Sequence, residues 1–94
     1  MEFSFSGHAF KRMAERGFSP DIIKSVIKNG TVIKSYPDDT PYPSRLIIGF
    51  DRKRPVHVVS AYNPKNDIEY VITVYEPESS RWKNDFTERR HDKK

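Results

Sequence analysis

The chain has 94 residues, 35% hydrophobic and 32% charged, which suits one domain with one modest core. It contains no cysteine, no apolar run long enough to span a membrane and no signal-peptide pattern, so we expect a cytoplasmic protein without disulfides and without a membrane segment. The formal charge of +4 favours a polyanion such as RNA, or an acidic protein, as the partner.

Two capped amphipathic patterns open the chain and predict a helical hairpin. The first helix covers residues 8–16 and ends before Gly17. The second begins at Pro20, which follows the cap residue Ser19, and ends at Asn29. The apolar positions repeat at helical spacing and predict one buried arc on each helix, formed by Ala9, Phe10, Met13, Ala14, Ile22, Ile23, Val26 and Ile27.

Four β-rich runs follow the helices, over residues 31–36, 45–50, 54–62 and 69–75. The turns between them are too short for parallel crossovers, so we expect a four-stranded antiparallel sheet. The N-terminal helical hairpin should pack on one face of this sheet, giving an α+β fold with the other face partly open. Residues 80–86 should form a short C-terminal helix or turn whose Trp82 and Phe86 dock on the body. The domain then spans residues 1–86, with a charged, disordered tail at 87–94.

The last two runs form a β-hairpin around the polar segment 63–67, which contains a proline. A five-residue turn there sets His57 opposite Thr73, with Tyr75 diagonal to His57. Alternation then predicts a core face made by Val56, Val58, Tyr70, Ile72 and Val74. The other face carries His57, Thr73 and Tyr75 among the small apolar residues Val59, Ala61 and Val71.

Four ordered segments carry a resemblance to a known group of proteins. They read HAFKRMAERGFS, NGTVIKSYPDDTPYPSRLIIGF, RPVHVVSAY and YVITVYEPESSRWKNDF, and they span nearly the whole chain. Together they resemble a family of small bacterial and archaeal proteins of unassigned function that is grouped with RelE-type toxins. The resemblance implies a barnase/colicin/RelE-like ribonuclease fold and a toxin-type endoribonuclease that needs no metal or cofactor and has a small antitoxin protein as partner. The chain departs from RelE itself, which depends on lysines, arginines and a late tyrosine, because the cluster here is centred on histidine.

Cleavage of RNA without a metal needs a base for the ribose 2′-hydroxyl, a cation for the phosphorane charge and an acid for the leaving oxygen. Histidine suits the proton transfers and arginine suits the phosphate oxygens. The candidate catalytic residues are His57 as the main acid–base group, His8, Arg16, Tyr75 and Thr73. The candidate RNA contacts are Arg12, Arg52, Lys53 and Arg54. On the first helix the row formed by His8, Arg12 and Arg16 meets His57 only if it reaches around an edge of the sheet, or if the helices cover the His57 face.

Each candidate also has a structural interpretation. His57 in a β run suits a half-buried histidine satisfied by a neighbour, and Arg12 and Arg16 suit a solvated face or an ion pair with Glu15 or the 38–39 loop. The two aspartates of that loop lie in a turn without other clustered ligands, so no metal site is expected. The alternative functions are a non-catalytic module of the same fold that binds nucleic acid or protein, and a structural protein that forms a homodimer.

Overall fold

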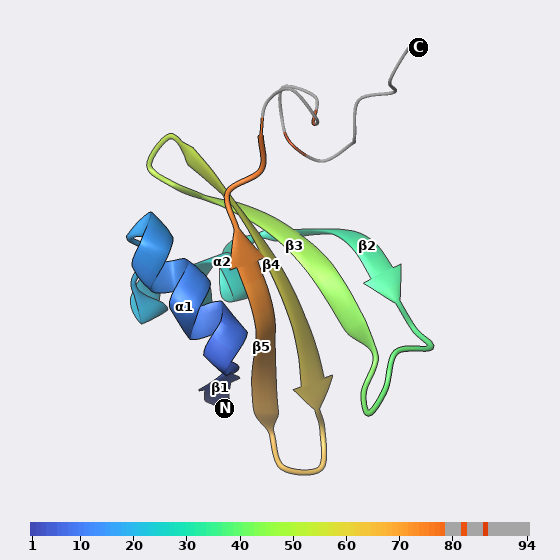
Figure 1. Ribbon diagram of the computed structural model, residues 1–94. Helices are drawn as coiled ribbons and strands as arrows, with labels where there is room; N and C mark the ends of the chain where they lie inside the picture. Colours follow the sequence, from blue (N-terminus) through green and yellow to red (C-terminus); the bar gives the residue numbers. More distant parts are fainter. Residues whose placement is uncertain (79–81, 83–85, 87–94) are drawn as a thin grey trace.

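The fold is a five-stranded mixed sheet with two helices, seen in a computed structural model that describes residues 1–78, Trp82 and Phe86 (Figure 1). In chain order the elements are β1 (Glu2–Phe5), α1 (Gly7–Arg16), α2 (Pro20–Asn29), β2 (Thr31–Tyr36), β3 (Ser44–Asp51), β4 (Arg54–Asn63) and β5 (Ile68–Tyr75). Across the sheet the order is β1-β5-β4-β3-β2. β1 pairs parallel with β5, and every other neighbouring pair is antiparallel.

The α+β class is therefore right, but the expectation of a four-stranded antiparallel sheet behind an N-terminal helical hairpin is wrong. A strand precedes the helices and makes the sheet mixed. In β1, Phe3 and Phe5 alternate at strand spacing, and both pack against the core. A four-residue strand offers too little alternation to stand out in the sequence, and its partner is the last strand of the chain. The proposed C-terminal helix and the 87–94 tail fall outside the described residues.

Side-chain caps explain where the two helices begin. The Ser6 hydroxyl accepts a hydrogen bond of 3.0 Å from the backbone N–H of Ala9 at the start of α1. Gly17, with φ of 73°, closes α1 in the left-handed conformation. Ser19 caps α2, and Pro20 occupies its first turn. Each helix has ten residues, and within the described chain neither is long and apolar enough to cross a membrane.

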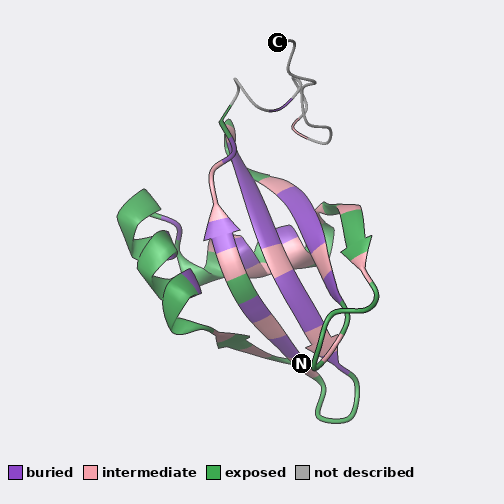
Figure 2. Cartoon of the chain, turned by 45° about the vertical axis from the view of Figure 1, so that its right-hand side comes forward, coloured by how far each residue is buried: buried purple, intermediate pink, exposed green. Residues whose placement is uncertain are grey.

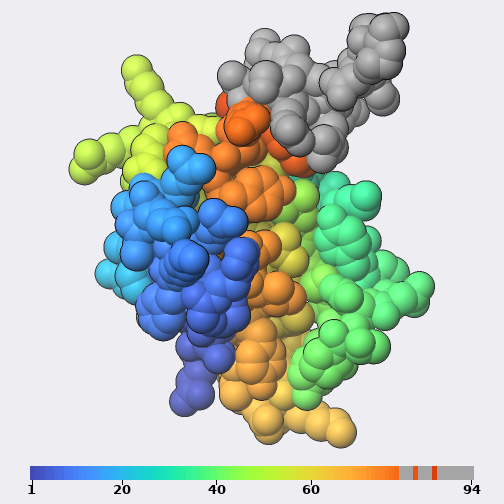
Figure 3. Space-filling view, viewed as in Figure 1, coloured from blue at the N-terminus to red at the C-terminus, as the bar shows by residue number. Residues whose placement is uncertain are grey.

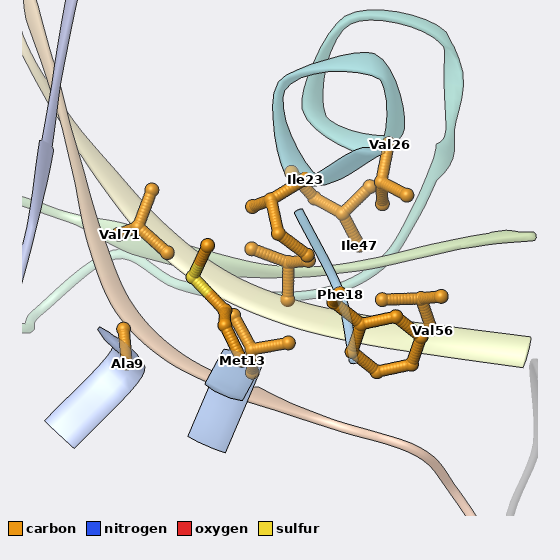
Figure 4. Close-up of a cluster of buried hydrophobic side chains, with 10 residues drawn as sticks. Ala9, Met13, Phe18, Ile23, Val26, Ile47, Val56 and Val71 are labelled. Carbon is orange, nitrogen blue, oxygen red and sulfur yellow. The ribbon is translucent and has the colours of Figure 1, made fainter. Parts of the chain in front are cut away.

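The core lies between the helices and one face of the sheet. In Figure 1, α1 lies beside β5 near one margin of the sheet, whereas α2 lies behind β3 and β4. Figure 4 shows side chains from both helices converging on the strands, and the buried cluster contains Ala9, Met13, Phe18, Ile23, Val26, Ile47, Val56, Val58, Val71 and Val74. Figure 2 shows that the buried residues are concentrated in the central strands, whereas the outer side of α1 is exposed.

The predicted buried arc of α1 is too wide. Ala9 and Met13 are buried as expected, but Phe10 is 54% exposed and Ala14 is exposed. Phe10 instead contacts Phe5 of β1, with ring centroids 5.4 Å apart. Because α1 packs at the margin of the sheet, only a narrow strip of its surface is covered. On α2, Ile23 is fully buried and Ile27 partly buried.

A bulge in β5 and a turn one residue shorter than expected together make the hairpin register differ from the predicted one. His57 pairs with Tyr75, not Thr73, and Thr73 pairs with Val59. The register then shifts, so that Asn63 pairs with Ile68 and the turn has four residues, 64–67. The Asn63 side chain accepts a 3.0 Å hydrogen bond from the N–H of Lys65, which draws Asn63 into β4.

The bulge also changes which residues of β5 face the core. Val74 joins Val56 and Val58 in the core, as predicted. Beyond the bulge, Val71 enters the core instead of Tyr70, and Tyr70 stacks on Tyr42 with centroids 6.0 Å apart. Ile72, the extra residue at the bulge, is 39% exposed. An inserted residue reverses the alternation of a strand, which explains why the prediction fails on one side of the bulge only.

Candidate functional site

A hollow of about 430 Å³ opens between α1 and the C-terminal end of β5. We call it the α1–β5 hollow. Its lining includes His8, Arg12 and Arg16 from α1, together with Thr73 and Tyr75 from β5. Figure 3 shows the side chains of α1, in blue, against those of β5, in orange, on one face of the molecule. Five of the residues predicted as functional therefore lie around one recess.

The convergence depends on how α1 is held at the margin of the sheet. The Ser6 hydroxyl donates a 2.8 Å hydrogen bond to the carbonyl of Ile72, and the Ser6 N–H donates to the carbonyl of Val71. These bonds fix the start of α1 beside β5, and Ala9 and Met13 then seat it in the core. His8 precedes Ala9 and Arg12 precedes Met13, so the row formed by His8, Arg12 and Arg16 borders the packed strip of α1 and faces the end of β5. The row therefore lies around the same hollow as Thr73 and Tyr75 of β5, but His57 is not among the residues that line it.

The three members of the row differ in their surroundings. Arg12 Nη1 lies 3.3 Å from Glu15 Oε1, and both side chains are exposed, so this is a local ion pair of small energetic value. This contact matches one of the structural interpretations of Arg12. Among the described residues, no carboxylate lies within ion-pair distance of His8 or Arg16. Arg16 is therefore the cation of the row that is most available to a bound anion.

His57 lies behind Tyr75 and does not line the hollow. It is 0% exposed, its Nε2 lies 2.9 Å from the carbonyl oxygen of Phe86, and its Nδ1 lies 3.1 Å from the hydroxyl of Tyr75. A carbonyl can only accept, so Nε2 carries the proton and Nδ1 accepts from the Tyr75 hydroxyl. The ring of Trp82 packs edge-on against the imidazole, with centroids 4.4 Å apart. Both expected C-terminal anchors thus dock on the body of the domain.

Burial sets the charge of His57. Loss of solvation lowers the pKa of His57 from its usual value, and the hydrogen bond to the Phe86 carbonyl offsets part of this shift. The neutral ring holds Tyr75 and is shielded from solvent, so it could influence a substrate only through Tyr75. These contacts match the structural interpretation of His57 as a histidine whose hydrogen bonds are satisfied by its neighbours. Because both ring nitrogens are hydrogen-bonded within the protein and the side chain is buried, no substrate atom can reach them directly.

Arg54 joins the β3–β4 hairpin to the end of α1. Its guanidinium donates to the carbonyl of Arg16 and lies over the ring of Phe18, with its central carbon 4.2 Å from the ring centroid. This predicted RNA contact is thus engaged within the protein. The neighbouring tip residues Arg52 and Lys53, also predicted as RNA contacts, are exposed.

Two carboxylates also line the hollow, and neither is evident as a site residue from sequence pattern alone. Glu76 lies 3.5 Å from Arg54, which balances its charge. Glu78 is exposed. The hollow is therefore mixed in charge, and any anion that enters it must be held by specific donors and not by a uniform positive field. These glutamates follow directly after β5, and the packing of α1 against β5 brings them to the row on α1.

A second pair of titratable side chains, one of them buried, lies elsewhere on the sheet. Glu69 of β5 is 2% exposed, and its carboxylate accepts a 3.0 Å hydrogen bond from Arg45 of β3. The pair spans β4 and satisfies a charge that would otherwise be buried alone, which is a structural role. Neither residue lines the α1–β5 hollow.

The chain belongs to the DUF4258 family, a domain of unknown function that matches residues 5–76. The match includes both helices and ends one residue after β5. No curated protein and no solved structure gives a significant match. The resemblance to a family of unassigned function is thereby confirmed. Its grouping with RelE-type toxins and ribonucleases receives no support from these comparisons.

Proposed function

We propose that this chain is a metal-independent endoribonuclease that cleaves RNA at the α1–β5 hollow. The observation that carries the proposal is the meeting of His8 and Arg16, from the first helix, with Thr73 and Tyr75, from the last strand, around one recess. An imidazole, a guanidinium and hydroxyls are the groups that transesterification of a phosphodiester requires.

The exposed histidine takes the acid–base role in this proposal. Neutral His8 accepts the proton of the ribose 2′-hydroxyl as its oxygen bonds to phosphorus, and the resulting imidazolium returns the proton to the 5′-oxygen as the P–O bond breaks. Arg16 stabilises the charge that develops on the phosphoryl oxygens, because its planar fork can donate two parallel hydrogen bonds. The products are a 2′,3′-cyclic phosphate and a 5′-hydroxyl end.

His57 acts as a positioning residue in the same scheme. It accepts the Tyr75 hydroxyl proton in a hydrogen bond, which fixes the orientation of the Tyr75 side chain at the hollow. The Tyr75 and Thr73 side chains then position the ribose while His8 acts on its 2′-hydroxyl.

A second candidate function is a non-catalytic RNA-binding module, and one observation favours it. Cleavage involves two proton transfers, yet among the described residues His8 is the one histidine that lines the hollow. With His57 buried, His8 has to serve as both base and acid. A binding module would need only the cations and the hydroxyls.

Purified protein incubated with a mixed single-stranded RNA tests both functions. His8→Ala should slow cleavage about 10² to 10⁴-fold, the range for one positioned acid–base group. Lys65→Ala, in the turn at the far end of β4, removes one positive charge away from the hollow and should leave the rate unchanged. Circular dichroism checks the fold of each variant. RNA binding without cleavage by the wild-type protein supports the binding module, and the absence of both refutes the two functions together.

The toxin aspect of the proposal adds a cytoplasmic setting and a small inhibitory protein as partner. Expression of the chain alone should then arrest bacterial growth, since cellular RNA would be cleaved. Expression of His8→Ala at the same level should not. Equal growth of cells that express the two proteins at matched levels would remove the toxin assignment, while leaving RNA cleavage in vitro as a separate question.

A further inference from the structure

The tip of the β3–β4 hairpin lies beside the C-terminal end of the row on α1. Arg54 holds the tip in this position, because its guanidinium donates a hydrogen bond to the carbonyl of Arg16 and stacks over the ring of Phe18, two residues after the end of α1. Two carboxylates also contact this guanidinium, Asp51 at 4.0 Å from Nη1 and Glu76 at 3.5 Å from Nη2. The tip is therefore tied to α1 by several contacts of one side chain. In Figure 3 this hairpin, in yellow-green, projects next to the blue helix.

Two exposed cations, Arg52 and Lys53, stand at that tip. Arg52 precedes Arg54 by two residues and Lys53 by one, which places both within roughly 7 Å of backbone from Arg54. Arg52 has a φ of 61°, so the chain reverses at this residue and directs the tip outward. No ion pair in the described part of the chain involves either side chain. Arg54 carries one positive charge against the two negative charges of Asp51 and Glu76, so with the exposed side chains of Arg52 and Lys53 the tip keeps a net positive charge.

We infer that the protein binds an extended single strand of RNA, with one phosphate in the α1–β5 hollow and further phosphates across the end of α1 at Arg52 and Lys53. This inference rests on the proposed function, for which it names the substrate class. Single-strand binders combine a recess for the reacting unit with cations that follow the backbone. The cations here run from the hollow over the C-terminal end of α1 to the hairpin tip.

The chemistry also favours a single strand over a duplex. Attack by the 2′-hydroxyl must be in line with the departing 5′-oxygen, and the sugar–phosphate geometry of an A-form helix keeps these groups off line. A flexible strand can turn one ribose into a recess lined by Tyr75 and Thr73, which a broad paired helix can only touch at its rim. The far strand of a duplex would gain nothing from cations that lie along one path.

Binding measurements with RNA that cannot be cleaved test the inference. We would use 2′-fluoro oligonucleotides of about 4 and about 12 nucleotides, within the range of single-strand site sizes. Arg52→Ala/Lys53→Ala should leave affinity for the short strand unchanged and weaken affinity for the long strand. The slope of log affinity against log salt should fall by about 1.4 for the long strand, since each lost phosphate contact contributes about 0.7. Lys34→Ala/Lys65→Ala, which removes the same charge from an edge strand and from the opposite hairpin, is the matched control and should keep the wild-type slope.

The outcomes separate this inference from the proposed function. If the wild-type protein cleaves RNA but the tip variant keeps both its affinity and its salt slope, the extended track is refuted and the enzyme remains. Tighter binding of a duplex of the same length would also overturn the inference. If the wild-type protein does not cleave any RNA, yet the tip variant loses affinity for the long strand alone, the track is supported and the catalytic proposal falls.

Discussion

Replacement of His57 by phenylalanine should make the stability of the protein less sensitive to mild acid. In the folded protein burial lowers the pKa of His57 below 6.5, so the ring resists protonation, whereas in the unfolded chain it titrates near 6.5. As the pH falls below 6.5, the unfolded state binds a proton that the folded state refuses. The stability that neutral His57 contributes is therefore fully present above pH 6.5 and is lost as the pH falls toward the folded pKa.

The size of the effect has an upper limit. One pH unit below the unfolded value, protonation favours the unfolded chain by about 1.4 kcal/mol if the folded ring stays neutral. His57→Phe keeps an aromatic ring against Trp82 but cannot titrate, and it removes the hydrogen bonds of the imidazole to the Tyr75 hydroxyl and the Phe86 carbonyl. Near neutral pH we expect this variant to be less stable by about 1 to 3 kcal/mol, from the unmade hydrogen bonds.

Urea unfolding at about pH 7.5 and about pH 5.5 measures both quantities. Trp82 is the only tryptophan of the chain and lies against residue 57, so its fluorescence reports on this contact. The gap in unfolding free energy between wild type and His57→Phe should narrow at the lower pH by up to about 1.4 kcal/mol. A gap of the same size at both pH values would show that His57 is not held neutral by burial.

Two further predictions concern the scaffold of the site. Arg54→Ala should lower the unfolding free energy by about 1 to 2 kcal/mol, because it removes a charged hydrogen bond to the Arg16 carbonyl and a cation–π contact from a partly exposed side chain. The control Arg52→Ala, at the same tip, should change the unfolding free energy by less than about 0.5 kcal/mol. Equal effects of the two variants in denaturant titrations would contradict the anchoring role of Arg54. Gly49→Ala should cost about 1 to 3 kcal/mol, since its Cβ would lie 2.8 Å from a methyl carbon of Val26. Gly7→Ala meets no atom within 4 Å and serves as control, so similar melting temperatures for the two alanine variants would disprove the tight packing at Gly49.

The parts of the fold that follow from local chemistry are predictable from the sequence. The serine caps and Gly17 mark both helices, and the alternation of Val56 and Val58 identifies one core face of β4. The row of His8, Arg12 and Arg16 also follows from helical spacing alone. These features depend on neighbours within a few residues, which is the range over which a sequence pattern carries information.

The rest depends on contacts between distant segments. The bulge at Ile72 reflects how the whole hairpin fits the core, and a period-two pattern cannot reveal an inserted residue. The burial of His57 is produced by Trp82 and Phe86, which return to the sheet after β5 has ended. The hollow itself exists because Ser6 ties α1 to β5, a contact that no local pattern encodes.

The partnership of the first strand and first helix with the last strand bears on how the protein is made. β1 pairs with β5, and the strongest sheet contact of α1 is also with β5. A ribosome synthesises β1 and α1 first, so both must wait until β5 emerges from the exit tunnel before they can dock. A ten-residue helix without its packing surface is marginal in water. Closing so long a loop makes docking of the N-terminal segment a late folding event. The α1–β5 hollow consequently cannot assemble while β5 is still being translated.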